Sequence, residues 1–454
     1  MPRVTGRRRR MIDDLIDDHT DHHVDAPATQ PPVAPLQPPS PRVEQAYRII
    51  SYVLRGGVLL SAGILLVGVA DVCRLALTSP RALSPTLLPH SLGAVLLDLR
   101  HGDPLAVILL GLLVLLVTPV VRVAVSIVAF VLEQDRVYAG ITTLVLLILG
   151  TSFALGPVLP AEPAASLGTA PPLGVFLVIF AAGVLAGGIG ALAGLGGGVL
   201  IVPLLTLVFH LPIAEAIGAS IVSVIATSSG AAAAYVRDHL TNLRVGMFLE
   251  VATTTGAIAG AFLVVIAPTA VLFVVFGLVL LVSALPLLVK IGEELPQPVE
   301  PDQWAQRLRL AGTYPDRRLG REVAYSATHV PLGFAMMWVA GLLSGLLGIG
   351  SGTFKVLAMD VVMRLPMKVS STTSNFMIGV TAAASAGIYF ARGDIQPLVA
   401  APVALGVLLG AMLGAKVLAH LSNTTLRKIF VPVLVVIAAE MLIRGGALLL
   451  GTPH

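Results

Sequence analysis

Long apolar segments without charged residues constrain the fold of this chain more than any other feature. The segment from Leu173 to His210 contains no Asp, Glu, Lys or Arg. A helix needs about 20 mainly apolar residues to cross the hydrocarbon core of a bilayer. Of the 454 residues, 56% are hydrophobic and 12% are charged, whereas about 25% are charged in an average soluble protein. We therefore predict an all-α, polytopic bundle of transmembrane helices, which excludes an ordinary soluble enzyme and a nucleic-acid-binding protein.

Two short segments carry nearly half of the charged residues, and we expect both to lie in the cytoplasm. One is residues 1–46, which combine four consecutive arginines, an Asp- and His-containing stretch and a Pro-rich run. Such a composition cannot bury a core, so it predicts a disordered tail. Its Asp and His residues either bind a divalent metal or are a solvated, charge-balanced stretch. The other segment is a loop at 291–329. Basic residues favour the cytoplasmic side of a membrane, so the N-terminus is predicted to be cytoplasmic.

The second half of the chain resembles the first half at a constant offset of 154 residues. This offset (348 − 194 = 154) places GLGGG at 194–198 over GIGSG at 348–352. A register kept over roughly 75 residues indicates an internal repeat. The same offset pairs further residues without a gap: Leu211-Pro212 with Leu365-Pro366, Ser220 with Ser374, Thr227 with Thr381, and Gly256 with Gly410.

The apolar runs and the repeat together predict the domains and their helices. We expect a three-helix membrane domain at 47–157, a linker at 158–173, a first repeat at 174–290 and a second repeat at 330–449. The block 173–210 is predicted to be a helix, a break and a shorter helix, because consecutive glycines are poor helix formers. The other predicted helices lie at 47–77, 104–133, 137–155, 214–236, 245–266, 270–290, 330–347, 353–364, 369–390, 396–419 and 425–449.

A glycine-broken helix at matching positions of two membrane repeats is typical of secondary transporters. Lipid cannot satisfy the backbone groups exposed at a break, so these groups are expected to line a cavity or a ligand site. Free N–H groups at a helix N-terminus attract anions, and glycine lets a ligand approach the backbone closely. The alternative is that the glycines only allow tight packing of helices.

The basic residues also predict the relative orientation of the repeats. Five elements per repeat place Arg237, Arg244, Arg364 and Lys368 in the cytoplasm, and the repeats are then inverted. If the short element at 199–210 is re-entrant, the count becomes even and the repeats run parallel. Arg392 falls on the outer side, against the rule.

The residues around the breaks resemble a known family. The block AGGIGALAGLGGGVLIVPLL, which ends at Leu205, is followed by AIGASIVSVIATSSGAAAAYVRDHLTNLRVG at 216–246, and GLLSGLLGIGSGTFKVLAM at 341–359 fits the same pattern. These blocks are similar to the sulfite exporter TauE/SafE family, over about 174–447. The resemblance implies transport of sulfite, sulfonates or related organosulfur anions. The second copy departs from the pattern, because Ser351 replaces a glycine and Lys355 stands where the first copy has Ile201.

Residues 45–157 resemble a separate, uncharacterised family of three-helix membrane proteins. The stretch LLVLLVTPVVRVAVSIVAFVLEQDRVYAGIT at 112–142 carries this resemblance. Similar proteins are found beside transporters of the sulfite exporter type. The fusion therefore suggests a partner or accessory role for this domain.

The candidate substrate-binding residues lie at the two breaks and on the polar helix after each break. Hydroxyl and amide donors suit the oxygens of sulfite or a sulfonate, although membrane Ser and Thr often bond only their own helix. The substrate-binding candidates are Gly196, Gly197, Gly198, Ser220, Ser223, Thr227, Gly350, Ser351, Gly352, Lys355, Ser374 and Asn375.

Ionisable residues inside predicted spans are further functional candidates. Lys355 either neutralises an anion or pairs with Asp360. Glu250 and Asp360 are the proton-coupling candidates. Arg122 lies within a helix of the N-terminal domain and either contacts the core of the repeats or snorkels. Glu440 and Arg444, four residues apart, are expected to pair.

The sequence thus predicts a multi-pass inner-membrane (plasma-membrane) secondary transporter, which moves small anions by alternating access coupled to protons. The family resemblance implies that it is an exporter. The alternatives are an anion channel on the same fold and a non-transporting assembly or sensing subunit. No catalytic constellation, metal site or cofactor is indicated. The expected partners are a small anionic substrate and the lipid bilayer, with no nucleic acid, and a homodimer stays an open possibility.

Overall fold

The computed structural model describes eight stretches of the chain. They are residues 41–78, 92–156, 173–193, 197–237, 240–288, 299–316, 321–418 and 423–451. Most of the predicted tail and linker lies outside them. Residues 41–46, which were assigned to the disordered tail, instead form the first turns of a helix.

The N-terminal domain contains the three predicted long helices and one short helix that was not predicted. The long helices are α2 (Pro41–Thr78), α4 (Pro104–Leu132) and α5 (Arg136–Leu155), and the short one is α3 (Leu92–Arg100). Asp103 caps α4 by accepting a hydrogen bond from the N–H of Leu105, and Pro104 supplies the fixed φ that suits a first helical position. The helix pair α2 and α4 packs closely and antiparallel, with Gly68 against Ile108 and Gly111 against Leu65.

The rest of the described chain forms two similar series of helices. The first series is α6 (Leu173–Ala193), α7 (Gly198–Leu207), α8 (Ile213–Arg237), α9 (Leu243–Ile266) and α10 (Thr269–Leu288). The second is α12 (Val330–Leu347), α13 (Gly352–Leu357) with the π-helical turn η4 (Ala358–Val362), α14 (Met367–Arg392), α15 (Pro397–Leu418) and α16 (Asn423–Leu449).

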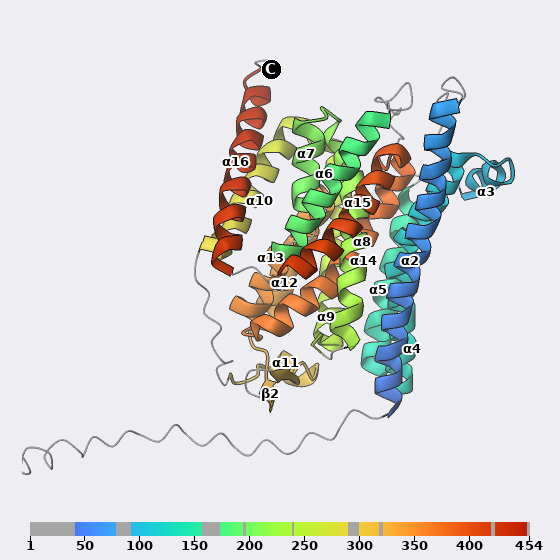
Figure 1. The fold of residues 1–454 in the computed structure, drawn as a ribbon. Coiled ribbons are helices and arrows are strands. Elements are labelled where there is room, and N and C mark those ends of the chain that lie inside the picture. The colour runs from blue at the N-terminus through green and yellow to red at the C-terminus, as the bar shows by residue number, and fades with distance from the viewer. Residues whose placement is uncertain are drawn as a thin grey trace, which may run out of the picture. The chain divides into compact units, whose positions relative to one another are not determined.

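Helices α8 and α14 lie side by side and antiparallel, with α2, α4 and α5 together on one side of them (Figure 1). Gly218 of α8 packs against Asp394, just past the end of α14, and Ser228 packs against Gly379. Near the opposite end, the Thr372 hydroxyl donates a hydrogen bond to the Leu240 carbonyl. In both helices 83% of the most apolar window is buried, so they form the centre of the bundle.

The two interrupted helices enter the bundle from opposite ends and turn back. The N–H of Thr328, just before α12, donates to the carbonyl of Met363, just after η4, so this hairpin opens at the end that carries α11 and β2 in Figure 1. Helix α6 runs parallel to α15, since Gly183 and Gly187 pack against Val403 and Val407 in that order. Helices α15, α6 and α8 all begin at the opposite end of the bundle, so the hairpin of α6 and α7 opens at that end.

This geometry corrects one expectation about orientation. A re-entrant short element was expected to make the repeats parallel. In the structure, however, the first helix of each hairpin starts on the same side of the bundle as the second helix ends. Each hairpin therefore adds no crossing, and three crossings per series remain. An odd number of crossings leaves the two series oppositely oriented.

Contacts between the two series recur at the offset of 154 residues. Gly187 packs against Val407, as Gly341 does against Thr253. Val184 likewise contacts Gly410, and Trp338 contacts Gly256. An inverted repeat predicts such exchanged pairs, because each α6-type helix then packs on the α9-type helix of the other series. The contacts support the repeat, which stays our interpretation.

The segment predicted as a plain cytoplasmic loop contains regular structure. Helix α11 (Gln303–Arg307) begins at its N-cap Asp302, and β1 (Gly312–Asp316) pairs antiparallel with β2 (Arg321–Tyr325). The side-chain amide of Asn242 donates to the Tyr325 hydroxyl at 2.9 Å. The segment was missed because its helix and strands are each only five residues long, below the length at which periodicity is informative.

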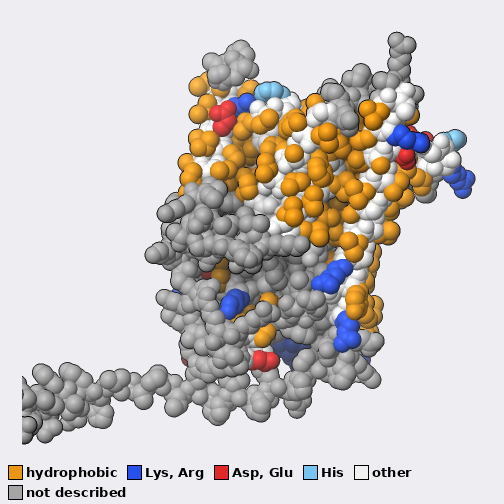
Figure 2. Space-filling model, viewed as in Figure 1, with side chains coloured by type: hydrophobic (Ala, Val, Ile, Leu, Met, Phe, Trp, Pro, Cys, Tyr) orange, Lys and Arg blue, Asp and Glu red, His pale blue; other side chains and the backbone are white. Residues whose placement is uncertain are grey.

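The described helices confirm an all-α polytopic membrane fold. Eight of them are long and apolar enough to cross a bilayer. Large apolar side chains such as Leu59, Leu60, Leu66 and Val67 of α2 are exposed, and apolar side chains cover much of the described surface in Figure 2. Exposed apolar surface of this extent suits a lipid environment.

We predict that a methyl group on either of two glycines separates the helix pairs. A Cβ on Gly256 would overlap the carbonyl oxygen of Trp338, and one on Gly410 would overlap that of Val184. Gly256→Ala and Gly410→Ala should each cost about 1–3 kcal/mol of stability, seen as a lower melting temperature in detergent. Gly230→Ala, on α8 with open space around it, should match or exceed the wild type. Unchanged melting of both first variants would contradict the close packing.

Candidate functional site

The second helix break has a defined left-handed backbone. Gly348 and Gly350 have φ values of 68° and 71°, and Ser351 has a φ of 47°. Glycine adopts this region without a Cβ clash, so these residues end α12 and reverse the chain before α13. At the first break, Gly194 to Gly196 lie outside the described residues, and Gly197 precedes α7. The predicted interruption is therefore confirmed directly at 348–352.

Ser220 of α8 connects the two breaks. Its hydroxyl oxygen lies 2.8 Å from the carbonyl oxygen of Gly348 and 3.1 Å from that of Gly198. Ser374 of α14, at the equivalent position, donates to the carbonyl of Gly352 at 3.2 Å. These two candidates therefore hold the hairpin tips against the central helices, and their hydroxyl protons are engaged by backbone carbonyls.

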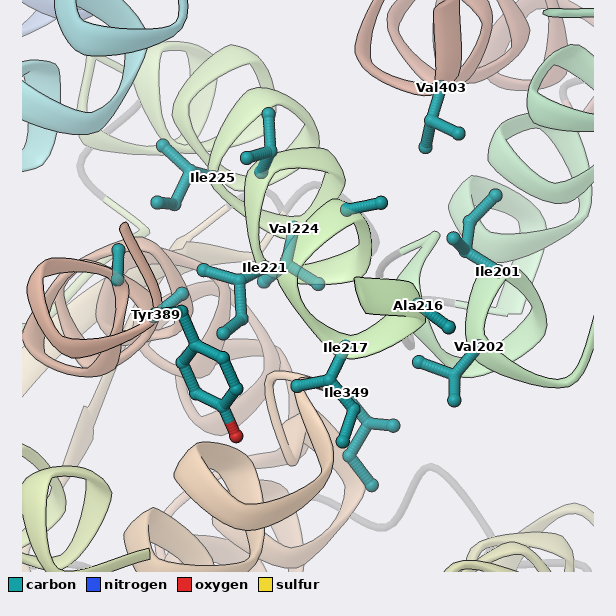
Figure 3. Packing of buried hydrophobic residues seen from close by; sticks show 14 of the residues in the cluster. Ile201, Val202, Ala216, Ile217, Ile221, Val224, Ile225, Ile349, Tyr389 and Val403 are labelled. Carbon is teal, nitrogen blue, oxygen red and sulfur yellow. The ribbon is translucent and has the colours of Figure 1, made fainter. Parts of the chain in front are cut away.

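Apolar side chains surround the breaks. Val224 lies beside both Gly198 and Gly350, and Val407 lies beside Gly197. Figure 3 shows Ile217, Ile221, Val224 and Ile349 gathered here. Because apolar side chains fill the space where a Cβ would lie, this packing favours the alternative that the glycines allow tight packing of helices. The charged groups lie farther along α13.

The other hydroxyl candidates behave differently from one another. Ser223 and Thr227 donate to carbonyls of their own helix, at Ser220 and Ser223, as membrane Ser and Thr often do. The Ser351 hydroxyl is buried and has no hydrogen-bond partner among the described residues. Asn375 is partly buried on α14.

Lys355 lies at the centre of a buried polar cluster. Its side chain is 0% exposed, and its ammonium donates to the Thr381 hydroxyl at 2.8 Å. Thr381 Oγ1 lies in turn 3.2 Å from Thr253 Oγ1 on α9. An ammonium has three protons to donate, so Lys355 retains donor capacity beyond this bond.

Glu250 of α9 faces two cations in this cluster. Its carboxylate lies 3.7 Å from an Nη2 atom of Arg122, and it also interacts electrostatically with Lys355. Neither Glu250 oxygen has a hydrogen-bond partner within the described part of the chain. Because two cations accompany one carboxylate, the ionised cluster has a net charge of +1.

The guanidinium of Arg122 stacks over the ring of Phe376, with 4.0 Å from its carbon to the ring centroid. Of the two alternatives for Arg122, contact with the core is confirmed, since the residue is 0% exposed. Together these residues define what we call the cationic cluster: Arg122, Glu250, Thr253, Lys355, Phe376 and Thr381.

Asp360 and two ion pairs, Arg392–Asp394 and Glu440–Arg444, lie outside the cationic cluster. Asp360, in η4, makes no ion pair with Lys355 in the described structure, so that alternative is wrong. The distance of five residues along α13 and η4 carries Asp360 to another face. Arg392, which broke the orientation rule, forms a buried ion pair with Asp394 at 2.8 Å. The predicted pairing of Glu440 with Arg444 is confirmed at 3.3 Å.

Sequence analysis missed Thr253 and Phe376 as site residues. Thr253 had an available signal, because it follows Glu250 by three residues and shares a helix face with it. Phe376 had none, since an apolar residue on an apolar helix is indistinguishable from core.

Comparison with known families accounts for most of the chain. The family described as "Sulfite exporter TauE/SafE" matches residues 178–441. The chain belongs to the TauE/SafE family. It is therefore a multi-pass membrane protein of a transporter family, as the resemblance implied. A second family, described as a protein of unknown function (DUF1634), matches residues 50–154.

Two relatives from Bacillus subtilis (strain 168) agree with this assignment. The chain is 27% identical over 279 residues to the probable membrane transporter protein YunE. The aligned residues cover 60% of this chain and 98% of the relative. It is 29% identical over 243 residues to the probable membrane transporter protein YdhB, covering 53% of this chain and 88% of the relative. No solved structure matches the chain.

We predict that Ser220 stabilises the TauE/SafE domain through the two breaks. Ser220→Ala leaves buried carbonyls of Gly198 and Gly348 without this donor and should cost about 1–3 kcal/mol, measured as a lower melting temperature in detergent. Ser223→Ala is the matched control, because Ser223 bonds only its own helix, and it should stay within about 0.5 kcal/mol. Equal melting of the two variants would contradict a linking role for Ser220.

Proposed function

We propose that this protein is a secondary active transporter, and by family resemblance an exporter, of small anions such as sulfite, sulfonates or related organosulfur anions. The observation that carries the proposal is the net positive charge of the cationic cluster. Uncompensated charge in a low-dielectric interior is costly. A small anion would neutralise this surplus charge and so lower the cost of burying the cluster inside a membrane.

The chemistry around Lys355 suits an oxyanion. Lys355 supplies a charge-assisted donor, and the hydroxyls of Thr381 and Thr253 lie next to it. Charge-assisted hydrogen bonds are stronger than neutral ones. The Glu250 carboxylate keeps the net charge at one, which limits how strongly an anion would be held and allows its release.

Two opposed hairpins support alternating access as the mechanism. Each hairpin opens at a different end of the bundle, and Ser220 contacts carbonyls at both tips. Moving one hairpin would therefore disturb the other. Such coupling between two gates around one central site is the requirement for alternating access.

The basic residues support a cytoplasmic position for the end that carries α11 and β2. Arg136, Arg244, Arg364 and Lys368 lie at helix termini on this end. The positive-inside rule then places the start of α2 in the cytoplasm as well. The plasma membrane, which the sequence predicted, is part of this proposal.

Replacing Lys355 should weaken anion transport. Lys355→Met keeps the chain length and removes the ammonium, so the KM for sulfite should rise at least about tenfold in counterflow with purified protein in liposomes. Arg444→Met is the control, because that cation pairs within α16, and its KM should remain at the wild-type value. An unchanged KM for Lys355→Met would refute the site.

The same liposomes separate the competing functions. A transporter accumulates labelled sulfite against its gradient when unlabelled sulfite flows out, whereas a channel cannot. Absence of any flux for sulfite, sulfonates and thiosulfate would instead favour a non-transporting assembly subunit.

Glu250 is the proton-coupling residue of the proposal. It is 0% exposed, lies 3.7 Å from Arg122 and interacts electrostatically with Lys355, so gain or loss of its proton changes the cluster charge directly. Glu250→Gln should abolish sulfite accumulation driven by a pH gradient while sulfite counterflow continues. Glu440→Gln, on the half-exposed pair of α16, should retain both. Normal pH-driven accumulation by Glu250→Gln would exclude Glu250 as the coupling residue.

A further inference from the structure

Arg122 belongs to a part of the chain that the transporter family does not include. It lies on α4 (Pro104–Leu132), within the DUF1634 match at 50–154 and outside the TauE/SafE match at 178–441. Its guanidinium nevertheless reaches Glu250 and Phe376, which both lie within the TauE/SafE match. The cationic cluster therefore draws on both domains.

The N-terminal domain contacts the TauE/SafE domain along several helices. Helix α2 packs on α8, α4 packs on α8, α14 and α15, and α5 packs on α9 and α14. Near one end of α5, Asp135 forms an ion pair of 3.0 Å with Arg244. Near the other end, the Ser152 hydroxyl donates to the Ala384 carbonyl. Contacts at both ends of α5 fix the domain, so the position of Arg122 is set by packing.

The described part of the chain offers no hydrogen-bond acceptor to the guanidinium of Arg122. Nε, Nη1 and Nη2 all lack a hydrogen-bond partner among the described residues, although the side chain is 0% exposed. At 3.7 Å the nearest Glu250 oxygen attracts the guanidinium but lies beyond hydrogen-bonding distance. Buried donors are nearly always satisfied, so these donors indicate an additional acceptor.

We propose that the N-terminal domain supplies Arg122 as an anion-binding residue of the transport site, a role that rests on the function proposed above. Phe376 holds the plane of the guanidinium by stacking on its face, which leaves the edges with their N–H groups for a ligand. A planar fork of donors matches two oxygens of one oxyanion. The ligand class is therefore a small oxyanion with at least two exposed oxygens, such as sulfite or a sulfonate. On this basis the domain is part of the transport unit.

The test compares four variants of the full chain for melting temperature in detergent and for sulfite KM in liposome counterflow. Arg122→Gln removes the cation and leaves Glu250 with one fewer partner. Arg122→Gln/Glu250→Gln removes one charge of each sign, so the cluster keeps its net charge of +1 and no carboxylate is left unpaired. Arg122→Lys keeps the charge without the planar fork. Asp135→Asn breaks the ion pair of Asp135 with Arg244, which joins the domains without touching the cluster.

We expect the double variant to recover the melting temperature of the wild type while its sulfite KM stays raised at least about tenfold. Arg122→Lys should also have a raised KM, and Asp135→Asn a wild-type KM. A double variant with wild-type KM would make Arg122 a mere counter-ion of Glu250 and overturn the inference. A raised KM in Asp135→Asn equal to that of the double variant would attribute the effect to domain docking and also overturn it.

The failure of the function itself is distinguishable from this outcome. A wild-type protein that shows no counterflow of sulfite, sulfonate or thiosulfate overturns the proposed function together with the role of Arg122. A wild type with sulfite counterflow, combined with an Arg122→Gln variant of unchanged KM, overturns only the role of Arg122.

Discussion

The charge imbalance buried among α4, α9, α13 and α14 is the constraint on which the rest of the structure depends. Two cations and one carboxylate, all 0% exposed, are expensive to keep in an apolar interior unless they are neutralised. Lys355 is satisfied in part by Thr381, whereas Arg122 and Glu250 have no hydrogen-bond partner in the described structure. The proposed anion site rests on these spare donors and on the one surplus positive charge of the ionised groups.

Glycine determines how the backbone reaches this site. At the second break, Gly348 and Gly350 adopt left-handed φ values, which let the chain turn back so that α13 places Lys355 next to α14. Elsewhere glycines bring α6 onto α15 and α12 onto α9 at distances that no Cβ would allow. The tips of the two hairpins then share one serine, Ser220, between their carbonyls. The proposed alternating access rests on this close packing and shared contact.

The N-terminal domain contributes a charged side chain to the cationic cluster. Fusion of a three-helix domain to a transporter suggests only an accessory, but Arg122 is inserted beside Glu250 and fixed by the ring of Phe376. The contacts of α5 with Arg244 and Ala384 hold the domain in register. A residue from outside the TauE/SafE match thereby affects the charge at the centre of that family's domain.

The sequence alone determined the class of fold, the long helices and the position of the second break, and it singled out Lys355 and Glu250 as candidates, because apolar length, glycine runs and charges within spans are local signals. Short elements such as α3, α11 and the β1–β2 hairpin escaped, since five to nine residues carry too little periodicity. Tertiary structure alone decided which partners meet: Ser220 with Gly348, Lys355 with Thr381 instead of Asp360, and Arg122 with Glu250. These pairs are separated by 26 to 128 residues, and no local pattern encodes the packing of helices that brings them together.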